Sequence, residues 1–197
     1  MQTIIEKSLE SSMSYEEYRS LVSELLSEGK STGNLQSDSY LNYSRLGNAR
    51  MKRLDKTFAL SPNANKSLAN AKDSHLWLVL TEGWCGDAGH ALPIMNKIAT
   101  ATGIDLKIVL RDQNDELMNL FLTDGNRSIP KLIVWDREKQ QLIDTWGPRP
   151  SEATAKVKAQ KEKFGLLDAD FKEALQRWYN KDKGKNIESD LIRLLQG

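Results

Sequence analysis

Residues 81–93 read TEGWCGDAGHALP, and they contain Cys85, the single cysteine of this 197-residue chain. The apolar run Leu76 to Leu80 lies directly before this stretch and predicts a short buried strand. Helical spacing follows from about Gly86 to Thr102, and the glycine at 103 ends it. The sequence therefore predicts a thiol in the first turn of a helix that follows a buried strand.

The composition describes an ordinary globular protein. It has 39% hydrophobic and 28% charged residues, and its net charge is +1. Such a balance gives no basic surface for nucleic acid. No apolar run approaches the ~20 residues of a membrane-spanning helix, and the first residues do not resemble a secretory leader. We therefore expect a cytoplasmic protein with neither nucleic acid nor membrane as a partner.

A lone cysteine forbids any disulfide within the chain, which fits a reducing compartment. By itself, a lone cysteine is as compatible with a small buried apolar side chain as with a reactive thiol. The residues around it have to decide between these two interpretations.

The hydrophobic periodicity changes twice along the chain. Helices are expected over 14–30, 40–58, 64–71, 86–102, 114–122, 151–163, 168–180 and 187–195, and strands over 75–80, 104–110, 131–135 and 141–146. This order predicts an α/β sheet core with helices added at both ends. We divide the chain into an N-terminal helical extension (1–69), a core (70–165) and a C-terminal helical extension (166–197), which together form one compact unit.

Four spaced features follow one another on the expected elements. Trp84-Cys85-Gly86 stands after the first core strand, Pro93 lies eight residues beyond the cysteine, Pro130 precedes a strand 45 residues beyond it, and Gly147 ends a strand 62 residues beyond it. In this order and spacing the sequence resembles the thioredoxin superfamily, and in particular bacterial thioredoxin-like proteins with helical flanks and a Trp-Cys-Gly-Asp motif. The resemblance implies a thioredoxin-like fold, a central mixed sheet flanked by helices.

The resemblance also implies a site. Cys85 takes the place of the attacking thiol, Pro130 that of the family's cis-proline, and Gly147 that of a glycine facing the active site. A cis bond before Pro130 would turn the backbone of Ile129 toward the thiol, where an extended substrate segment could pair with it. The expected substrate groove comprises Trp84, Gly86, Asp87, Ile129, Pro130 and Gly147, with Cys85 as the catalytic residue.

The position of the thiol has a physical consequence. Backbone N–H groups and the helix dipole at a helix N-terminus favour thiolate over thiol, and thiolate is the attacking species. Asp87 opposes this, because its carboxylate disfavours a second negative charge nearby. We expect a depressed pKa for Cys85, although less depressed than without the carboxylate. The alternative interpretation of Asp87, a carboxylate that stabilises the dipole of the helix, is favoured.

Ala88 marks the departure from the dithiol proteins of the superfamily. They carry their resolving cysteine at this position, so a mixed disulfide on Cys85 would have to be released by an outside thiol. Val79 stands where many thioredoxins bury an aspartate that helps to deprotonate the resolving thiol. Both residues indicate a site built for one thiol.

Two other polar residues near the motif receive ordinary interpretations. His90 is expected to be an exposed surface histidine rather than a base or a metal ligand, and no metal-ligand spacing is present. Arg149 lies in a proline-rich stretch after Gly147, where a plain turn is favoured over a position near the site from which it could bind an acidic group.

The leading hypothesis is monothiol thiol–disulfide exchange, without a cofactor, with a low-molecular-weight thiol or a protein disulfide as partner. The alternative is a non-catalytic thioredoxin-fold binding or scaffold module for a protein partner, with Cys85 vestigial. Binding of an iron–sulfur cluster by a dimer, as in monothiol glutaredoxins, is disfavoured because the residues after Gly147 do not resemble a glutathione-binding turn.

Overall fold

The computed structural model describes residues 1–68 and 75–196. Within them, four strands form one sheet in the order β2-β1-β3-β4. These strands are β1 (His75–Thr81), β2 (Asp105–Leu110), β3 (Lys131–Asp136) and β4 (Gln141–Trp146). β1 pairs parallel with β2 and antiparallel with β3, and β3 pairs antiparallel with β4. The mixed sheet expected from the resemblance is therefore confirmed.

The described helices are α1 (Gln2–Glu10), α2 (Tyr15–Ser27), α3 (Asp38–Thr57), α4 (Pro62–Leu68), α5 (Ala88–Thr102), α6 (Asp115–Leu120), α7 (Ser151–Phe164), α8 (Ala169–Asp182) and α9 (Lys185–Gln196), with a 3₁₀ turn η1 (Arg111–Gln113). The expected helix over 64–71 corresponds to α4, and its last residues lie outside the described part. The periodicity did not predict α1. None of the helices in residues 1–68 and 75–196 is long and apolar enough to cross a membrane.

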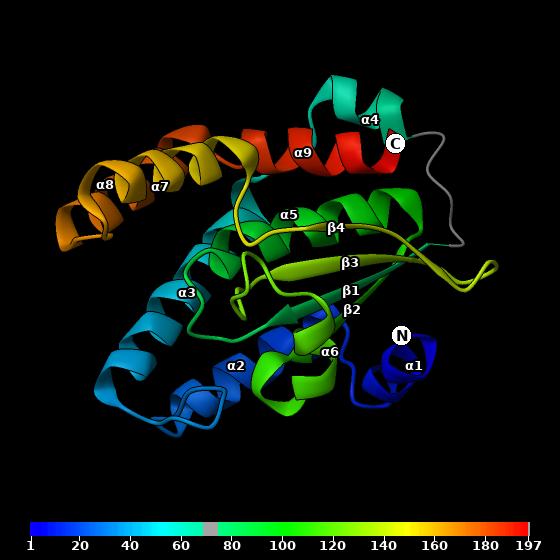
Figure 1. Ribbon diagram of the computed structural model, residues 1–197, viewed down its shortest axis with the longest axis horizontal. Helices are drawn as coiled ribbons and strands as arrows, with labels where there is room; N and C mark the ends of the chain where they lie inside the picture. The colour runs from blue at the N-terminus through cyan, green and yellow to red at the C-terminus, as the bar shows by residue number, and fades with distance from the viewer. Residues whose placement is uncertain (69–74, 197) are drawn as a thin grey trace.

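Helices cover both faces of the sheet. Figure 1 shows α5 and α9 on one side of it and α6 and α1 on the other. All residues of β1 from Leu76 onward are buried, which explains its continuous apolar run. β4 lies at the edge and most of its side chains are exposed.

The N-terminal segment is joined to this core at several points. Ser14 and Glu17 form a capping box at the start of α2, and the buried side chains of Tyr18 and Val22 fix the helix in the core. Met13 exchanges two backbone hydrogen bonds of 2.8 Å with Ile108 of β2. The residues before the core strands therefore pack with the sheet.

α3 crosses α5 at close range. A Cβ on Gly89 of α5 would lie 3.2 Å from the Cα and the carbonyl oxygen of Gly47 in α3. A Cβ on Gly47 would lie 2.9 Å from the carbonyl oxygen of Gly83, in the turn after β1. Because both positions lack a side chain, α3 reaches the backbone around Cys85.

Candidate functional site

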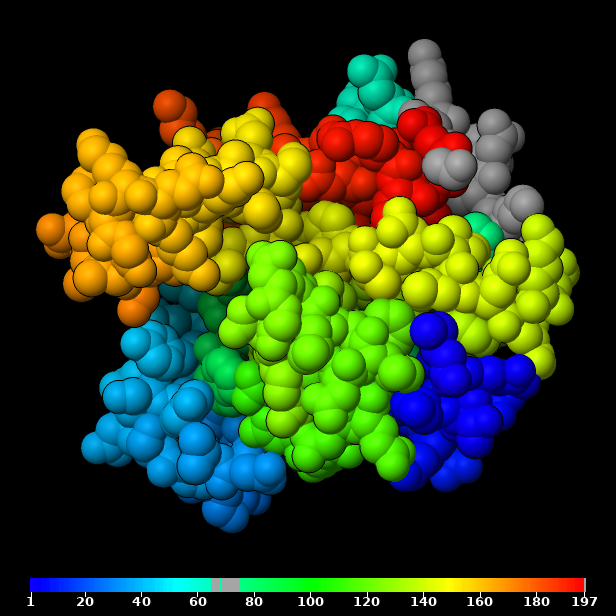
Figure 2. All heavy atoms as spheres, in the orientation of Figure 1, coloured from blue at the N-terminus to red at the C-terminus, as the bar shows by residue number. Residues whose placement is uncertain are grey.

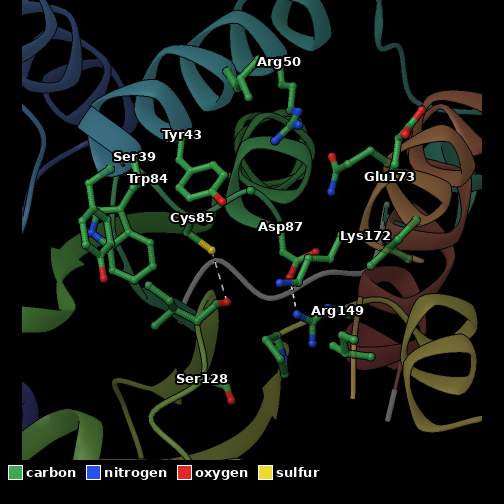
Figure 3. A pocket seen from close by; sticks show the side chains of 18 of the residues that line it. Ser39, Tyr43, Arg50, Trp84, Cys85, Asp87, Ser128, Arg149, Lys172 and Glu173 are labelled. Atoms are coloured by element: carbon green, nitrogen blue, oxygen red, sulfur yellow. Dashed lines mark hydrogen bonds and ion pairs between the residues drawn. The ribbon is translucent and has the colours of Figure 1, made fainter. Parts of the chain in front are cut away.

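Cys85 lies in the turn between β1 and α5, opposite the start of β3. Its backbone N–H donates to the carbonyl oxygen of Glu82 over 3.0 Å. Its Sγ donates a hydrogen bond to the carbonyl oxygen of Ile129 over 3.3 Å, and the Ile129–Pro130 peptide bond is cis. The thiol and the proline peptide thus face each other, as Figure 3 shows.

The thiol is shielded from solvent. Cys85 is 7% exposed, and burial is the largest cause that raises the pKa of its thiol to about 12, followed by the charge of Asp87. The backbone N–H groups of Asp87 and Ala88 act in the opposite direction, as expected at a helix end, but they are outweighed. The expectation of a depressed pKa was therefore wrong, because the packing around the helix end removes the thiol from water.

Asp87 is held by two side chains from the C-terminal half of the chain. Its Oδ2 lies 2.9 Å from Nη2 of Arg149, and its Oδ1 accepts a hydrogen bond of 2.9 Å from the hydroxyl of Tyr179. It makes no side-chain capping bond to α5, so the favoured dipole interpretation does not describe its main contacts. Burial raises its pKa, although Arg149 lowers it. Arg149, for which a plain turn was favoured, meets the acidic group of the site.

His90 is buried, contrary to the expectation of a surface histidine. It is 2% exposed, its Nε2 shares a hydrogen bond of 3.1 Å with Oε1 of Gln176, and its ring stacks on Tyr179 with centroids 4.3 Å apart. Burial is the main cause that lowers its pKa to about 4. The expectation failed because α8 covers this face of α5, which the local sequence does not indicate.

Trp84, which was expected in the substrate groove, is half-buried beside the thiol. The ring of Tyr40 meets it edge-on with centroids 5.1 Å apart, and the guanidinium of Arg111 lies 4.9 Å from the indole centroid. Arg111 is itself fixed by Asp112, with 2.8 Å between its Nε and Oδ1. The indole is therefore held from two sides.

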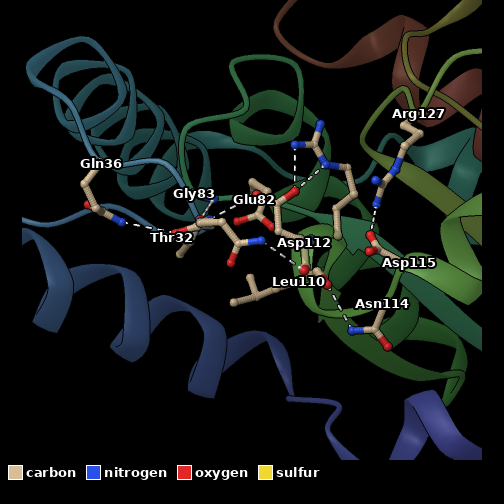
Figure 4. Close-up of polar contacts among 12 residues, drawn as sticks. Thr32, Gln36, Glu82, Gly83, Leu110, Asp112, Asn114, Asp115 and Arg127 are labelled. Carbon is tan, nitrogen blue, oxygen red and sulfur yellow. Dashed lines mark hydrogen bonds and ion pairs between the residues drawn. The ribbon is translucent and has the colours of Figure 1, made fainter.

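A polar network behind Trp84 ties the loop before α3 to the ends of β1 and β2 (Figure 4). The N–H of Gly83 donates to Oγ1 of Thr32 over 2.7 Å, and the N–H of Asp112 donates to Oε1 of Glu82 over 2.9 Å. Glu82 is fully buried, and burial raises its pKa. This network fixes the turn from which Cys85 extends.

A cavity of about 920 Å³ lies beside Cys85. Trp84, Cys85, Gly86, Asp87 and Ile129 contribute to its wall, together with residues of α3 and α8. Figure 2 shows the surface hollowed between α3 and the α7–α8 pair. The helical extensions on both sides of the core therefore shape the cavity.

Two residues expected in the groove are not part of this wall. Pro130 and Gly147 lie in contact with each other instead, and a Cβ on Gly147 would lie 2.1 Å from the carbonyl oxygen of Pro130. Gly147 has a φ of 116°, which favours glycine. Its role in the described structure is to let the end of β4 approach the start of β3.

Sequence reasoning missed the residues that the distant helices bring to the site. Arg50 of α3 and Tyr179 and Gln176 of α8 belong to no motif, and only their amphipathic helices could have suggested that they pack on the core. Among the described residues, no group of three or more His, Cys, Asp or Glu side chains could hold a metal ion.

The fold and the cysteine turn opposite a cis-proline define a thioredoxin-fold protein. The chain belongs to the thioredoxin family, since the family model described as thioredoxin matches residues 33–163. The match begins in the loop before α3 and therefore includes α3 and α4, which we placed in the N-terminal extension.

Two solved structures show the same fold. A protein of unknown function from Pseudomonas aeruginosa aligns with a TM-score of 0.56 at 19% identity, over 79% of this chain and 85% of that one. An HIV epitope-scaffold aligns with a TM-score of 0.58 at 16% identity, over 94% and 99%. No curated protein matches the sequence.

Proposed function

We propose that this protein is a thioredoxin-fold binding module whose cavity receives a small ligand beside Cys85. The observation that carries the proposal is the state of the thiol. Cys85 is 7% exposed at the wall of a cavity of about 920 Å³, and its hydrogen is donated to Ile129. A thiol with a pKa of about 12 is almost entirely protonated at neutral pH, so the resting protein offers a shaped cavity rather than a nucleophile.

The dimensions of the cavity favour a small ligand. Its volume lies within the range of roughly 300–1,000 Å³ that is typical of small-molecule sites. Aromatic and aliphatic side chains of α3 and α8 line it, and a few polar groups converge at its wall. A folded protein surface would not reach the buried sulfur, whereas a small molecule or a flexible segment would.

Binding can be tested with N-phenyl-1-naphthylamine, an uncharged aromatic probe whose fluorescence rises in apolar surroundings. We expect saturable binding that Cys85→Ser leaves unchanged and that Ala169→Trp, which adds bulk at the cavity wall on α8, abolishes. Ala101→Trp, at an exposed position of α5 away from the wall, is the matched control. Binding that is insensitive to Ala169→Trp would place the probe elsewhere and overturn the proposal.

Monothiol exchange is the second candidate, and the placement of Sγ 3.3 Å from the carbonyl oxygen before the cis-proline favours it. In this reaction the Cys85 thiolate attacks one sulfur of a disulfide, the S–S bond breaks, and the other sulfur leaves as a thiolate that takes up a proton. An external thiol, which a reducing cytoplasm would supply, then attacks the mixed disulfide and releases Cys85.

Alkylation of the native protein by iodoacetamide across pH separates the two candidates. The binding module predicts a reaction midpoint above that of a free thiol, such as N-acetylcysteine, and a slow reaction at neutral pH. A midpoint below that of the free thiol would support exchange and remove the basis for a resting, protonated Cys85.

A further inference from the structure

The charges of the cavity wall are unevenly matched. The wall contains five cationic side chains and two carboxylates, namely Arg50, Arg111, Arg127, Arg149 and Lys172 against Asp87 and Glu173. Three of the arginines pair with aspartates, and Glu173 pairs with an arginine of its own helix. Among the residues of known placement, Arg50 and Lys172 have no ion-pair partner within 4 Å. The wall therefore carries two positive charges without a direct counter-charge.

Arg50 extends from α3 into the cavity near the thiol, as Figure 3 shows. Its Nη1 comes so close to Gly86 that a Cβ there would lie 3.2 Å from it. The guanidinium is partly buried, and this desolvation is the main cause that lowers its pKa. Asp87 attracts it, but Arg149 and Tyr179 already occupy the two oxygens of that carboxylate.

A cation that is partly removed from water and lacks a direct partner leaves part of its hydration uncompensated. An oxyanion in the cavity would supply the missing partner, and guanidinium groups bind carboxylate or sulfonate oxygens through paired hydrogen bonds. Lys172 would add a second positive charge from α8. The apolar part of a ligand would lie against Tyr43 and Leu46 of α3, Phe171 of α8, and Leu167 in the loop before α8.

We propose that the ligand of this cavity is a small organic anion with an aromatic or apolar body, whose acidic group binds Arg50. This inference rests on the proposed binding function and adds the chemical class of the ligand. The apolar body supplies contact area between α3 and α8, and the ion pair with Arg50 orients the molecule beside Cys85.

The test compares two probes of nearly the same shape. 8-Anilino-1-naphthalenesulfonate carries a sulfonate, and N-phenyl-1-naphthylamine is its uncharged counterpart. We expect the sulfonate to bind more tightly at low salt and to lose on the order of tenfold in affinity in Arg50→Gln, with a smaller loss in Lys172→Gln. The affinity of the uncharged probe should change by less than about twofold, since it forms no hydrogen bond of this kind.

Matched controls are Arg45→Gln, an exposed arginine on α3, and Lys97→Gln, an exposed lysine on α5, neither of which is part of the wall. Equal binding of both probes, or a sulfonate affinity that Arg50→Gln leaves unchanged, would overturn the anion inference while the cavity stands. If Ala169→Trp left the affinity of both probes unchanged, the binding function itself would be overturned.

A measurement on the unmodified protein keeps the inference falsifiable if Arg50→Gln does not fold. Salt should weaken the binding of the sulfonate and leave that of the uncharged probe nearly constant, because salt screens the ion pair only. Salt-independent binding of the sulfonate would contradict an anion site at Arg50.

Discussion

The hydroxyl of Tyr179 in α8 donates a hydrogen bond of 2.9 Å to Oδ1 of Asp87, two residues after the cysteine. Because the same ring stacks on His90, one side chain of the C-terminal extension contacts both polar residues that follow Cys85. The C-terminal helices are therefore part of the site, and changes in α8 should alter the surroundings of the Cys85 thiol.

Removal of this hydroxyl should destabilise the fold. In Tyr179→Phe the ring can still stack on His90, but the largely covered carboxylate of Asp87 loses a donor, so we expect the free energy of unfolding to fall by about 1–2 kcal/mol. Urea unfolding followed by circular dichroism measures it. Tyr43→Phe, at a ring that is 57% exposed, is the control. Equal stability of the two variants would mean that the bond to Asp87 contributes nothing measurable.

Neutralising Asp87 should make the thiol more acidic. The carboxylate is the second cause of the raised pKa of Cys85, and in Asp87→Asn the positive charge of Arg149 would also lose its partner beside the sulfur. The midpoint of iodoacetamide alkylation should move to lower pH but stay above that of a free thiol, since burial is unchanged. Asp144→Asn on the exposed edge strand should not move it. An unchanged or higher midpoint in Asp87→Asn would contradict this account.

His90 should make the protein acid-sensitive. Its pKa is about 4 in the folded state against about 6.5 in the unfolded chain, so the unfolded state takes up the proton first as pH falls. Stability is therefore lost between these two values, by roughly 3 kcal/mol at most. Arg50 and Arg53 lower the pKa of His90 further, whereas the hydrogen bond with Gln176 raises it.

The check is the pH dependence of unfolding in His90→Phe, compared with the unmodified protein. Asp87 and Glu82 have raised pKa values and so favour folding as pH falls, in both proteins. The difference in the free energy of unfolding between the two proteins isolates His90. The variant should become more stable relative to the unmodified protein as the pH falls from about 6.5 to about 4. Parallel curves would show that His90 does not titrate across the transition.

The close crossing of α3 should not tolerate a methyl group. In Gly47→Ala the new Cβ would meet the carbonyl oxygen of Gly83 at 2.9 Å, so α3 or the turn has to move. We expect a loss of about 1–3 kcal/mol, although alanine favours a helix over glycine by about 1 kcal/mol. Asn42→Ala, at an exposed position of the same helix, should be neutral or slightly stabilising. A Gly47→Ala variant as stable as the natural chain would show that the crossing adapts freely.

The sequence predicted the elements whose signals are local. The apolar run of β1 indicates a buried strand on a short stretch of chain, and β2, β3 and β4 lie close to the ranges expected for them. α2 begins beside the expected start at residue 14, where Ser14 caps the helix. The nine-residue helix α1 escaped because its only buried apolar side chain is Ile5, which is too little for a periodic pattern.

By itself, the sequence determined that the chain has one thiol, that no residue at 88 can resolve a disulfide on it, and that it stands where a strand passes into a helix opposite a proline. The tertiary structure alone decided the state of that thiol. Its protonation depends on which distant side chains exclude water around it, and α3 and α8 enclose the cavity beside it from positions that no motif connects to Cys85. Desolvation is a property of packing in three dimensions, so the local helix-end signal predicted the opposite direction for the pKa.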